Sequence, residues 1–470
     1  MNRATPLLAA ALALPFALDA PPASAQQATT IALEARRDLA LTVYQNGLGL
    51  VEERRWVPLV PGANRLDLLG VSERIVAPSL VVSGEGLTLG EQAWRPADLT
   101  PQRLLESAVG GRVRLVREHP ETGETVSEPA VLLSLAGGPV LRVGDRIEID
   151  PPGRIVLDRL PDDLSAEPRL GLSLEAGEGG ARELGLAYLV EGLGWQADYV
   201  ATLDESGARL ELTGLLTVSN GTDVVFEDAA LSVVAGEVSR DYGRPQPYQA
   251  AAPKMMRAEM AADSVAAPQA VGELYLYDTG RSVDLARGES RQLVLFQDLA
   301  IAAKRRLRFD GLVTAGGGPE QVGPEQAAVL LEFDNPEGRE ARPLPAGTLR
   351  LYDLSGERRL FAGEAAIGHT PAGGTLELTV GRAFDVTGSA TVTDLERLSD
   401  RVYEIAQEIT LENAKDTAVE IEVAGHLPRG WSLLEESREH ELESANRILW
   451  RVPVPAGGET TLTYRMRIAQ

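Results

Sequence analysis

The chain has 470 residues, a net charge of −24 and no cysteine. Its length allows two to four domains with separate cores. The lack of cysteine excludes disulfides, thiolate zinc sites and iron–sulfur clusters. The acidic balance, with only three lysines, disfavours a nucleic-acid partner.

The first 25 residues have the order of a secretory signal. Met1-Asn2-Arg3 is a short positive start, residues 6–18 are apolar, and Ala23-Ser24-Ala25 places small residues before a cleavage site at Gln26. A retained anchor is the alternative, but the apolar run is shorter than the roughly 20 residues that cross a bilayer. We therefore expect a signal peptide over residues 1–25, no transmembrane segment after cleavage, and a periplasmic or secreted bacterial protein.

Short apolar strands and turn residues dominate the next 130 positions. Residues 26–98 predict an N-terminal β domain built from hairpins. A helix is expected over Thr100–Val109, where Thr100 can cap the first turn and Pro101 can start it. Residues 99–160 are expected to join this helix to a small SH3-like barrel. Its five strands are expected at Val113–Val116, Ala130–Leu135, Val140–Val143, Arg146–Ile149 and Arg154–Leu157.

The strands become longer after this segment, and one unit recurs along the chain. A strand, an Asn/Asp turn and a second strand appear around Ser219–Thr222, Asp334–Pro336 and Asn413–Asp416. Three such echoes indicate repeated sandwich units. We expect an all-β, multidomain protein with a central β-sandwich region over residues 161–241 and 271–392.

The last segment, residues 393–470, alternates with a period of two. Along Tyr403–Leu411 and Leu462–Ile468, apolar residues alternate with charged and polar ones. The predicted fold is an immunoglobulin-like β-sandwich with one buried and one wet face on each sheet.

Residues 242–270 lack any apolar period and are rich in alanine and proline. We interpret them as a flexible insert. Met255, Met256 and Met260 lie in it, and their thioethers could bind Cu(I). Methionines that fill a groove or contact a partner are the favoured interpretation.

No compact catalytic or metal-binding signature stands out. The four histidines, His119, His369, His426 and His440, do not show the spacing that places two ligands on one metal. Ser173 and Ser219 are serines without a nucleophile elbow. Asn220-Gly221-Thr222 matches a glycosylation sequon, which means little in a bacterial periplasm. We therefore predict no catalytic, cofactor-binding or metal-binding residue, and no cofactor.

Several acidic groups are candidate sites. Asp162-Asp163, Glu435-Glu436, and Asp198 with Asp204 could act as glycosidase carboxylates, which lie about 5 to 10 Å apart. Chance explains such pairs in a chain this acidic. Asp334-Asn335-Pro336-Glu337 could bind calcium, but a simple turn explains it better.

The one basic cluster is Lys304-Arg305-Arg306-Leu307-Arg308. It could bind an anionic glycan or lipid headgroup, but a strand with one charged face is the preferred interpretation. Trp195, Trp431 and Trp450 could stack on sugars, although tryptophans beside apolar strand residues usually lie in a sandwich core.

Two stretches carry a family resemblance. Gly192–Tyr199, and Arg397–Tyr403 followed by Ile409–Asp416, resemble the bacterial domain of unknown function 4139 family, which also appears in mucoidy-inhibitor proteins. The resemblance runs from about Leu41 to the end. It implies a fold and no agreed activity, and the chain lacks the coiled-coil heptads expected of a mucoidy inhibitor. Residues 426–432, 448–450 and 455–468 also look like immunoglobulin-like repeats of bacterial surface proteins.

These observations predict an exported, non-catalytic binding or scaffold protein of the bacterial cell envelope. An envelope protein or a glycan is the expected partner. The alternative is a carboxylate-dependent hydrolase that acts on envelope polysaccharide or peptide.

Overall fold

The computed structural model describes residues 28–118, 123–161, 164–239, 268–311, 321–338 and 341–469. These residues are almost entirely β-structure, 68% in strands, arranged in several sheets, which confirms the predicted all-β class. None of the helices among them is long and apolar enough to cross a membrane. The predicted signal peptide, residues 1–25, lies outside the described residues.

The chain divides into two compact units, each assembled from separated segments. Unit 1 combines the residues up to Ala35 with Trp56–Val71 and Gly84–Glu183, and unit 2 combines Arg36–Arg55, Ser72–Ser83 and the chain from Leu184 onward. The segment predicted as one N-terminal domain, residues 26–98, therefore contributes to both units. Strands β3 (Leu48–Leu59) and β13 (Gly180–Glu191) run from one unit into the other.

A four-stranded sheet forms one part of unit 1, in the order β1-β4-β12-β6. Leu170, Leu172 and Leu174 alternate along β12 and are buried, as a strand with one core-facing side requires. The strand bounds are β1 Thr29–Ile31, β4 Gly62–Leu68, β12 Arg169–Ala176 and β6 Leu87–Arg95.

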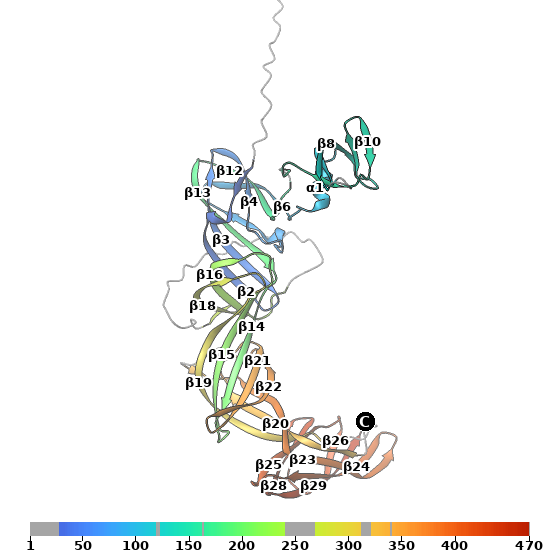
Figure 1. The fold of residues 1–470 in the computed structure, drawn as a ribbon. Coiled ribbons are helices and arrows are strands. Elements are labelled where there is room, and N and C mark those ends of the chain that lie inside the picture. The colour runs from blue at the N-terminus through green and yellow to red at the C-terminus, as the bar shows by residue number, and fades with distance from the viewer. Residues whose placement is uncertain are drawn as a thin grey trace, which may run out of the picture. The chain divides into compact units, whose positions relative to one another are not determined.

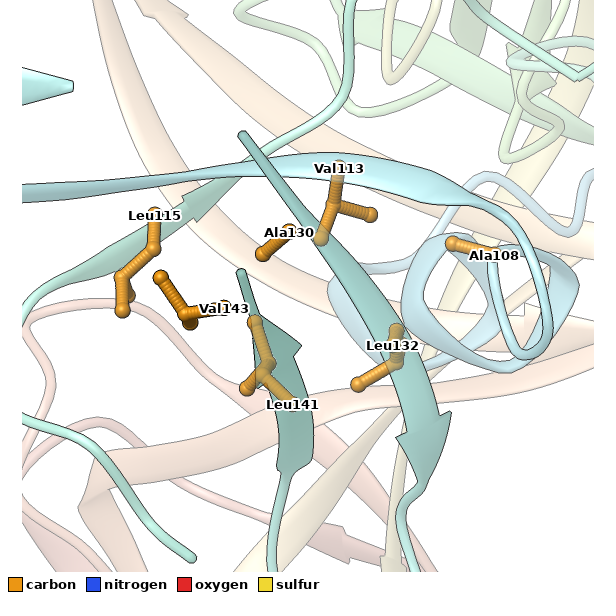
Figure 2. Packing of buried hydrophobic residues seen from close by; sticks show 7 residues of the cluster. All are labelled: Ala108, Val113, Leu115, Ala130, Leu132, Leu141 and Val143. Carbon is orange, nitrogen blue, oxygen red and sulfur yellow. The ribbon is translucent and has the colours of Figure 1, made fainter. Parts of the chain in front are cut away.

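The predicted helix and the five strands after it form the other part of unit 1. Helix α1 (Pro101–Ser107) begins after Thr100, whose hydroxyl accepts a hydrogen bond from the Arg103 N–H, which confirms the predicted cap. Figure 2 shows Ala108, directly after α1, in one buried cluster with Leu132 and Leu141. The sheet has the order β10-β9-β8-β7-β11, with bounds β7 Arg112–Glu118, β8 Thr125–Ser134, β9 Val140–Val143, β10 Arg146–Ile149 and β11 Arg154–Val156.

Unit 2 contains two larger sheets (Figure 1). The seven-stranded sheet has the order β17-β18-β16-β2-β3-β13-β5, with β17 Gln269–Val271, β18 Leu274–Leu285, β16 Phe226–Ala235, β2 Arg36–Tyr44 and β5 Val81–Ser83. The predicted flexible insert extends to residue 270, but β17 already begins at Gln269, so the last two residues of the insert belong to a strand. Residues 242–267 of this insert lie outside the described residues.

The second sheet of unit 2 has thirteen strands. Ten follow one path, β22-β21-β14-β15-β19-β20-β23-β24-β29-β26, and β25, β28 and β27 continue from β19. The bounds are β14 Leu193–Leu203, β15 Arg209–Asn220, β19 Ser290–Phe309, β20 Gln321–Asp334, β21 Gly347–Ser355, β22 Arg358–Ile367, β23 Thr375–Ser399, β24 Val402–Asn413, β25 Val419–His426, β26 Trp431–Glu436, β27 Glu441–Ser444, β28 Arg447–Val454 and β29 Gly458–Ala469.

Buried asparagines mark the three predicted repeats. Asn220, Asn335 and Asn413 stand at or just after the end of a strand, and each is only 1–2% exposed. The side-chain nitrogen of each donates to backbone carbonyls of its own turn and of a second turn. Asn220 reaches Val224, Leu285 and Ala286; Asn335 reaches Arg342, Thr370 and Pro371; Asn413 reaches Thr417, Val454 and Pro455. We call this arrangement the asparagine clamp.

The clamp gives the sequence echoes a physical basis. Each asparagine fixes the end of one strand to the turn that starts its antiparallel neighbour: β15 to β19, β20 to β23, and β24 to β29. An apolar side chain could not satisfy these carbonyls, and an unsatisfied buried carbonyl costs about 1–3 kcal/mol. The same buried asparagine arrangement therefore stands behind each of the three sequence echoes, and the predicted repeated sandwich units stay a prediction.

The alternation predicted near the C-terminus is also confirmed. Along β29, Leu462, Tyr464, Met466 and Ile468 are buried between polar neighbours. On β24 the polar face differs at one position, because Glu404 is buried and held by guanidinium groups of β29. The immunoglobulin-like assignment of residues 393–470 stays a prediction.

Candidate functional site

Four residues considered separately in the sequence come together at one end of unit 2. Glu436, the last residue of β26, accepts hydrogen bonds from Trp450 Nε1 at 2.9 Å and pairs with His440 Nδ1 at 3.1 Å. The His440 ring lies between two indoles, 6.4 Å from Trp431 and 6.3 Å from Trp450. We call Trp431, Glu436, His440 and Trp450 the Trp-Glu-His cluster.

Local strand geometry explains the cluster. Trp431 and Glu436 lie on β26, His440 lies in the link to β27, and Trp450 lies on β28. Trp431 also donates from Nε1 to the Ala445 carbonyl at 3.2 Å. The cluster therefore joins the edge strand β26 to β28, which lies on the side branch of the same sheet that runs through β25.

The inner side of the cluster is buried. The Trp450 ring stacks on Tyr464 at 5.1 Å, and the Tyr464 hydroxyl donates to Gln407 Oε1. Gln407 Nε2 in turn donates to the Gly311 carbonyl at 3.1 Å. Burial raises the pKa of Tyr464, so this phenol stays protonated at physiological pH.

The outer side is accessible. The side chains of Glu436 and His440 are 23% and 25% exposed. A carboxylate that orients an imidazole between aromatic rings can bind a polar ligand, and it is also the orienting half of a general-base arrangement. A hydrolase would need a nucleophile or a second carboxylate as well. Glu435, its neighbour in sequence, is exposed and is paired across to Arg465 in the register of β26 and β29.

The basic cluster is neutralised within the fold. Arg308 is 5% exposed and contacts Glu422, Glu377 and Glu443 at 3.0–3.3 Å. Arg306 contacts Glu422 at 2.9 Å as well. These ion pairs join β19, β23 and β25, and Glu443 adds β27. The interpretation as a charged strand face is supported, and no open anion site remains at the two arginines.

Asp198 and Asp204 do not form a catalytic pair. Asp198 is buried on β14, where it accepts hydrogen bonds from Arg350 at 2.9 Å and Thr217 at 3.1 Å. Asp204 lies in the turn after the end of β14, so the two carboxylates are about 20 Å apart along an extended strand. That separation is larger than a glycosidase allows.

Asp204 lines an open surface hollow of about 300 Å³. The Ser206 hydroxyl and backbone N–H groups of the turn hold the Asp204 carboxylate and lower its pKa. Arg305 pairs with Asp353 across the hollow at 2.9 Å. The lining is polar and largely hydrogen-bonded to itself.

The calcium loop and the sequon both coincide with asparagine clamps. Asn335 uses its amide nitrogen on backbone carbonyls, and Asp334 accepts from the Thr375 hydroxyl, which supports the simple turn. The amide nitrogen of Asn220 is likewise hydrogen-bonded and buried, so the folded chain does not offer it for glycosylation.

The other candidates have structural roles or lie outside the described residues. Trp195 is buried and donates to the Val234 carbonyl. His369 accepts from the Ala346 N–H, and Ser219 is hydrogen-bonded to Ser290. Ser173 lies within β12, and His426 is the last residue of β25. His119, Asp162-Asp163, Met255, Met256 and Met260 lie outside the described residues.

The part of the chain that the structure describes holds no group of three or more His, Cys, Asp or Glu side chains that could hold a metal ion. No family model matches the chain. No curated protein matches it either.

Proposed function

We propose that the protein is an exported, non-catalytic binding or scaffold protein of the bacterial cell envelope. The observation that carries the proposal is that its prominent polar groups act within the fold. Three asparagine clamps and the Arg308–Glu422 network hold strands together, and Asp198 lies on β14 far from Asp204 in the turn after it. Polar groups that are used to hold strands together favour a protein that presents a fixed binding surface over an enzyme that needs free catalytic groups.

The proposed address rests on the sequence. The signal-like residues 1–25 support export, and the resemblance to the domain of unknown function 4139 family supports a bacterial origin. A net charge of −24 favours a neutral glycan or a basic envelope protein as the partner over nucleic acid. The Trp-Glu-His cluster is the proposed contact point, because the partly exposed Trp431 ring and an oriented carboxylate suit either class.

One observation favours the competing hydrolase. Glu436 orients His440 at 3.1 Å in a partly exposed position, as a general base would require. The variant Glu436→Gln removes the charge but keeps an oxygen that can accept from Trp450, and Glu435→Gln is the matched control on the exposed neighbour.

Crosslinking in cells and a glycan array, both with the chain from Gln26 onward, test the binding proposal. We expect one reproducible envelope protein or glycan, with binding weakened by Glu436→Gln and unchanged by Glu435→Gln. Equal binding by both variants would remove the Trp-Glu-His cluster from the contact, and the lack of any partner would contradict the binding proposal.

A further inference from the structure

Strand β10 in unit 1 has the reverse of the expected polarity. Its two isoleucines, Ile147 and Ile149, are 55% and 77% exposed. The alternate residues, Arg146 and Glu148, lie on the opposite face, where Glu148 accepts a hydrogen bond from Arg117 at 2.7 Å. The sheet has a buried face, yet both isoleucines face solvent. Exposed apolar side chains of this kind indicate a surface that binds another protein.

β10 is also a free edge. It ends the order of the five-stranded sheet and is paired only with β9 in the described residues. The hairpin between β9 and β10 has a two-residue turn, so Val143 and Arg146 form a hydrogen-bonded pair. Hydrogen-bonded and non-hydrogen-bonded pairs alternate along an antiparallel ladder, so Arg146, Glu148 and Asp150 point their backbone groups toward β9. The bond from the Asp150 N–H to the Pro139 carbonyl at 2.8 Å agrees with this alternation. The backbone N–H and C=O groups of both isoleucines therefore point away from β9.

We propose that two copies of the protein associate through antiparallel pairing of their β10 strands, about a two-fold axis at Ile147. Two copies of one edge can pair only where residues whose backbone groups point outward stand opposite each other. These residues are every second one along β10, so a two-fold axis must pass through a residue and not between two residues. With the axis at Ile147, Arg146 stands opposite Glu148 of the second copy, and the same pair recurs by symmetry. An axis at Glu148 would instead oppose two like charges.

The resulting dimer is weak. It adds one pair of backbone hydrogen bonds, two ion pairs and contacts between isoleucines, an interface below the roughly 1,200 Å² of stable complexes. We expect association in the micromolar range or weaker. This self-association goes beyond the proposed function and does not depend on it.

Sedimentation velocity of the chain from Gln26 onward, over a concentration series that extends to the solubility limit, tests the pairing. Ile147→Pro removes only a donor that points outward, so β9 pairing and the circular dichroism spectrum should persist while the dimer is lost. Ile147→Thr keeps the donor and is the matched control, with a dimer that is weakened and still present. A monomer at every concentration, or a dimer that Ile147→Pro leaves intact, would overturn the proposal.

A charge reversal tests the register. Arg146→Glu should weaken the dimer at least ~10-fold, because it places a carboxylate opposite Glu148 of the second copy while the Arg117–Glu148 pair stays intact. Arg154→Glu, on the opposite edge strand β11, should have no effect. If Arg154→Glu disrupts the dimer and Arg146→Glu does not, the copies pair edge to opposite edge and the two-fold register is wrong.

Discussion

Replacing Asn413 by alanine should destabilise unit 2 more than replacing an exposed asparagine by alanine does. Asn413 is 2% exposed, and its side chain donates to the Thr417 and Pro455 carbonyls at 2.9 Å and accepts from the Lys415 N–H at 3.1 Å. Alanine removes these three bonds. At a net value of 0.5–1.5 kcal/mol each, with two carbonyls left without a donor, the expected loss is about 2–4 kcal/mol.

Differential scanning calorimetry of the whole chain provides the assay, with urea unfolding followed by tryptophan fluorescence as a second probe. Asn446→Ala is the matched control, because this side chain is exposed and accepts a hydrogen bond from the exposed Ser444. We expect the control to change stability by less than about 0.5 kcal/mol. A loss below about 1 kcal/mol for Asn413→Ala would refute the view that the clamp fixes β24 to β29.

Two further predictions follow from buried polar groups. Arg308→Ala should cost about 3–5 kcal/mol, because it removes a buried guanidinium that Glu422, Glu377 and Glu443 share and leaves the buried Glu422 with Arg306 alone. Arg305→Ala on a surface pair should cost about 0–1 kcal/mol in the same calorimetric assay. Burial raises the pKa of Tyr464 above its unfolded value of about 10. Its contribution to stability is therefore complete below that pH and is lost as pH rises toward the folded pKa, so an absorbance titration near 295 nm should show Tyr464 ionising together with unfolding.

Local pattern explains which structural features were predicted from the sequence. The period-two alternation along Leu462–Ile468 fixes which side chains face the core, and the cap at Thr100 fixes the start of α1. The Asn/Asp turns marked the repeats because each repeat needs the same polar residue at the same strand end. These features depend on residues that are neighbours in the chain.

Long-range contacts explain what was missed. The sequence shows four separate candidates, because only the fold brings β26 close to β28: Trp431, Glu436, His440 and Trp450. Glu436 and His440 have the spacing Glu-x-x-x-His. This spacing indicates a shared site only on a helix, and these two residues lie on a strand and in the link that follows it. The sequence also did not predict that each unit is built from separated segments, because β3 and β13 have the pattern of ordinary strands within one domain.

A turnover screen with the chain from Gln26 onward, against envelope polysaccharides and peptides, separates a binder from an enzyme. We predict no product from any substrate, with Glu436→Gln indistinguishable from the wild-type chain. Product formation that Glu436→Gln abolishes and Glu435→Gln preserves would contradict the account and assign the Trp-Glu-His cluster to catalysis.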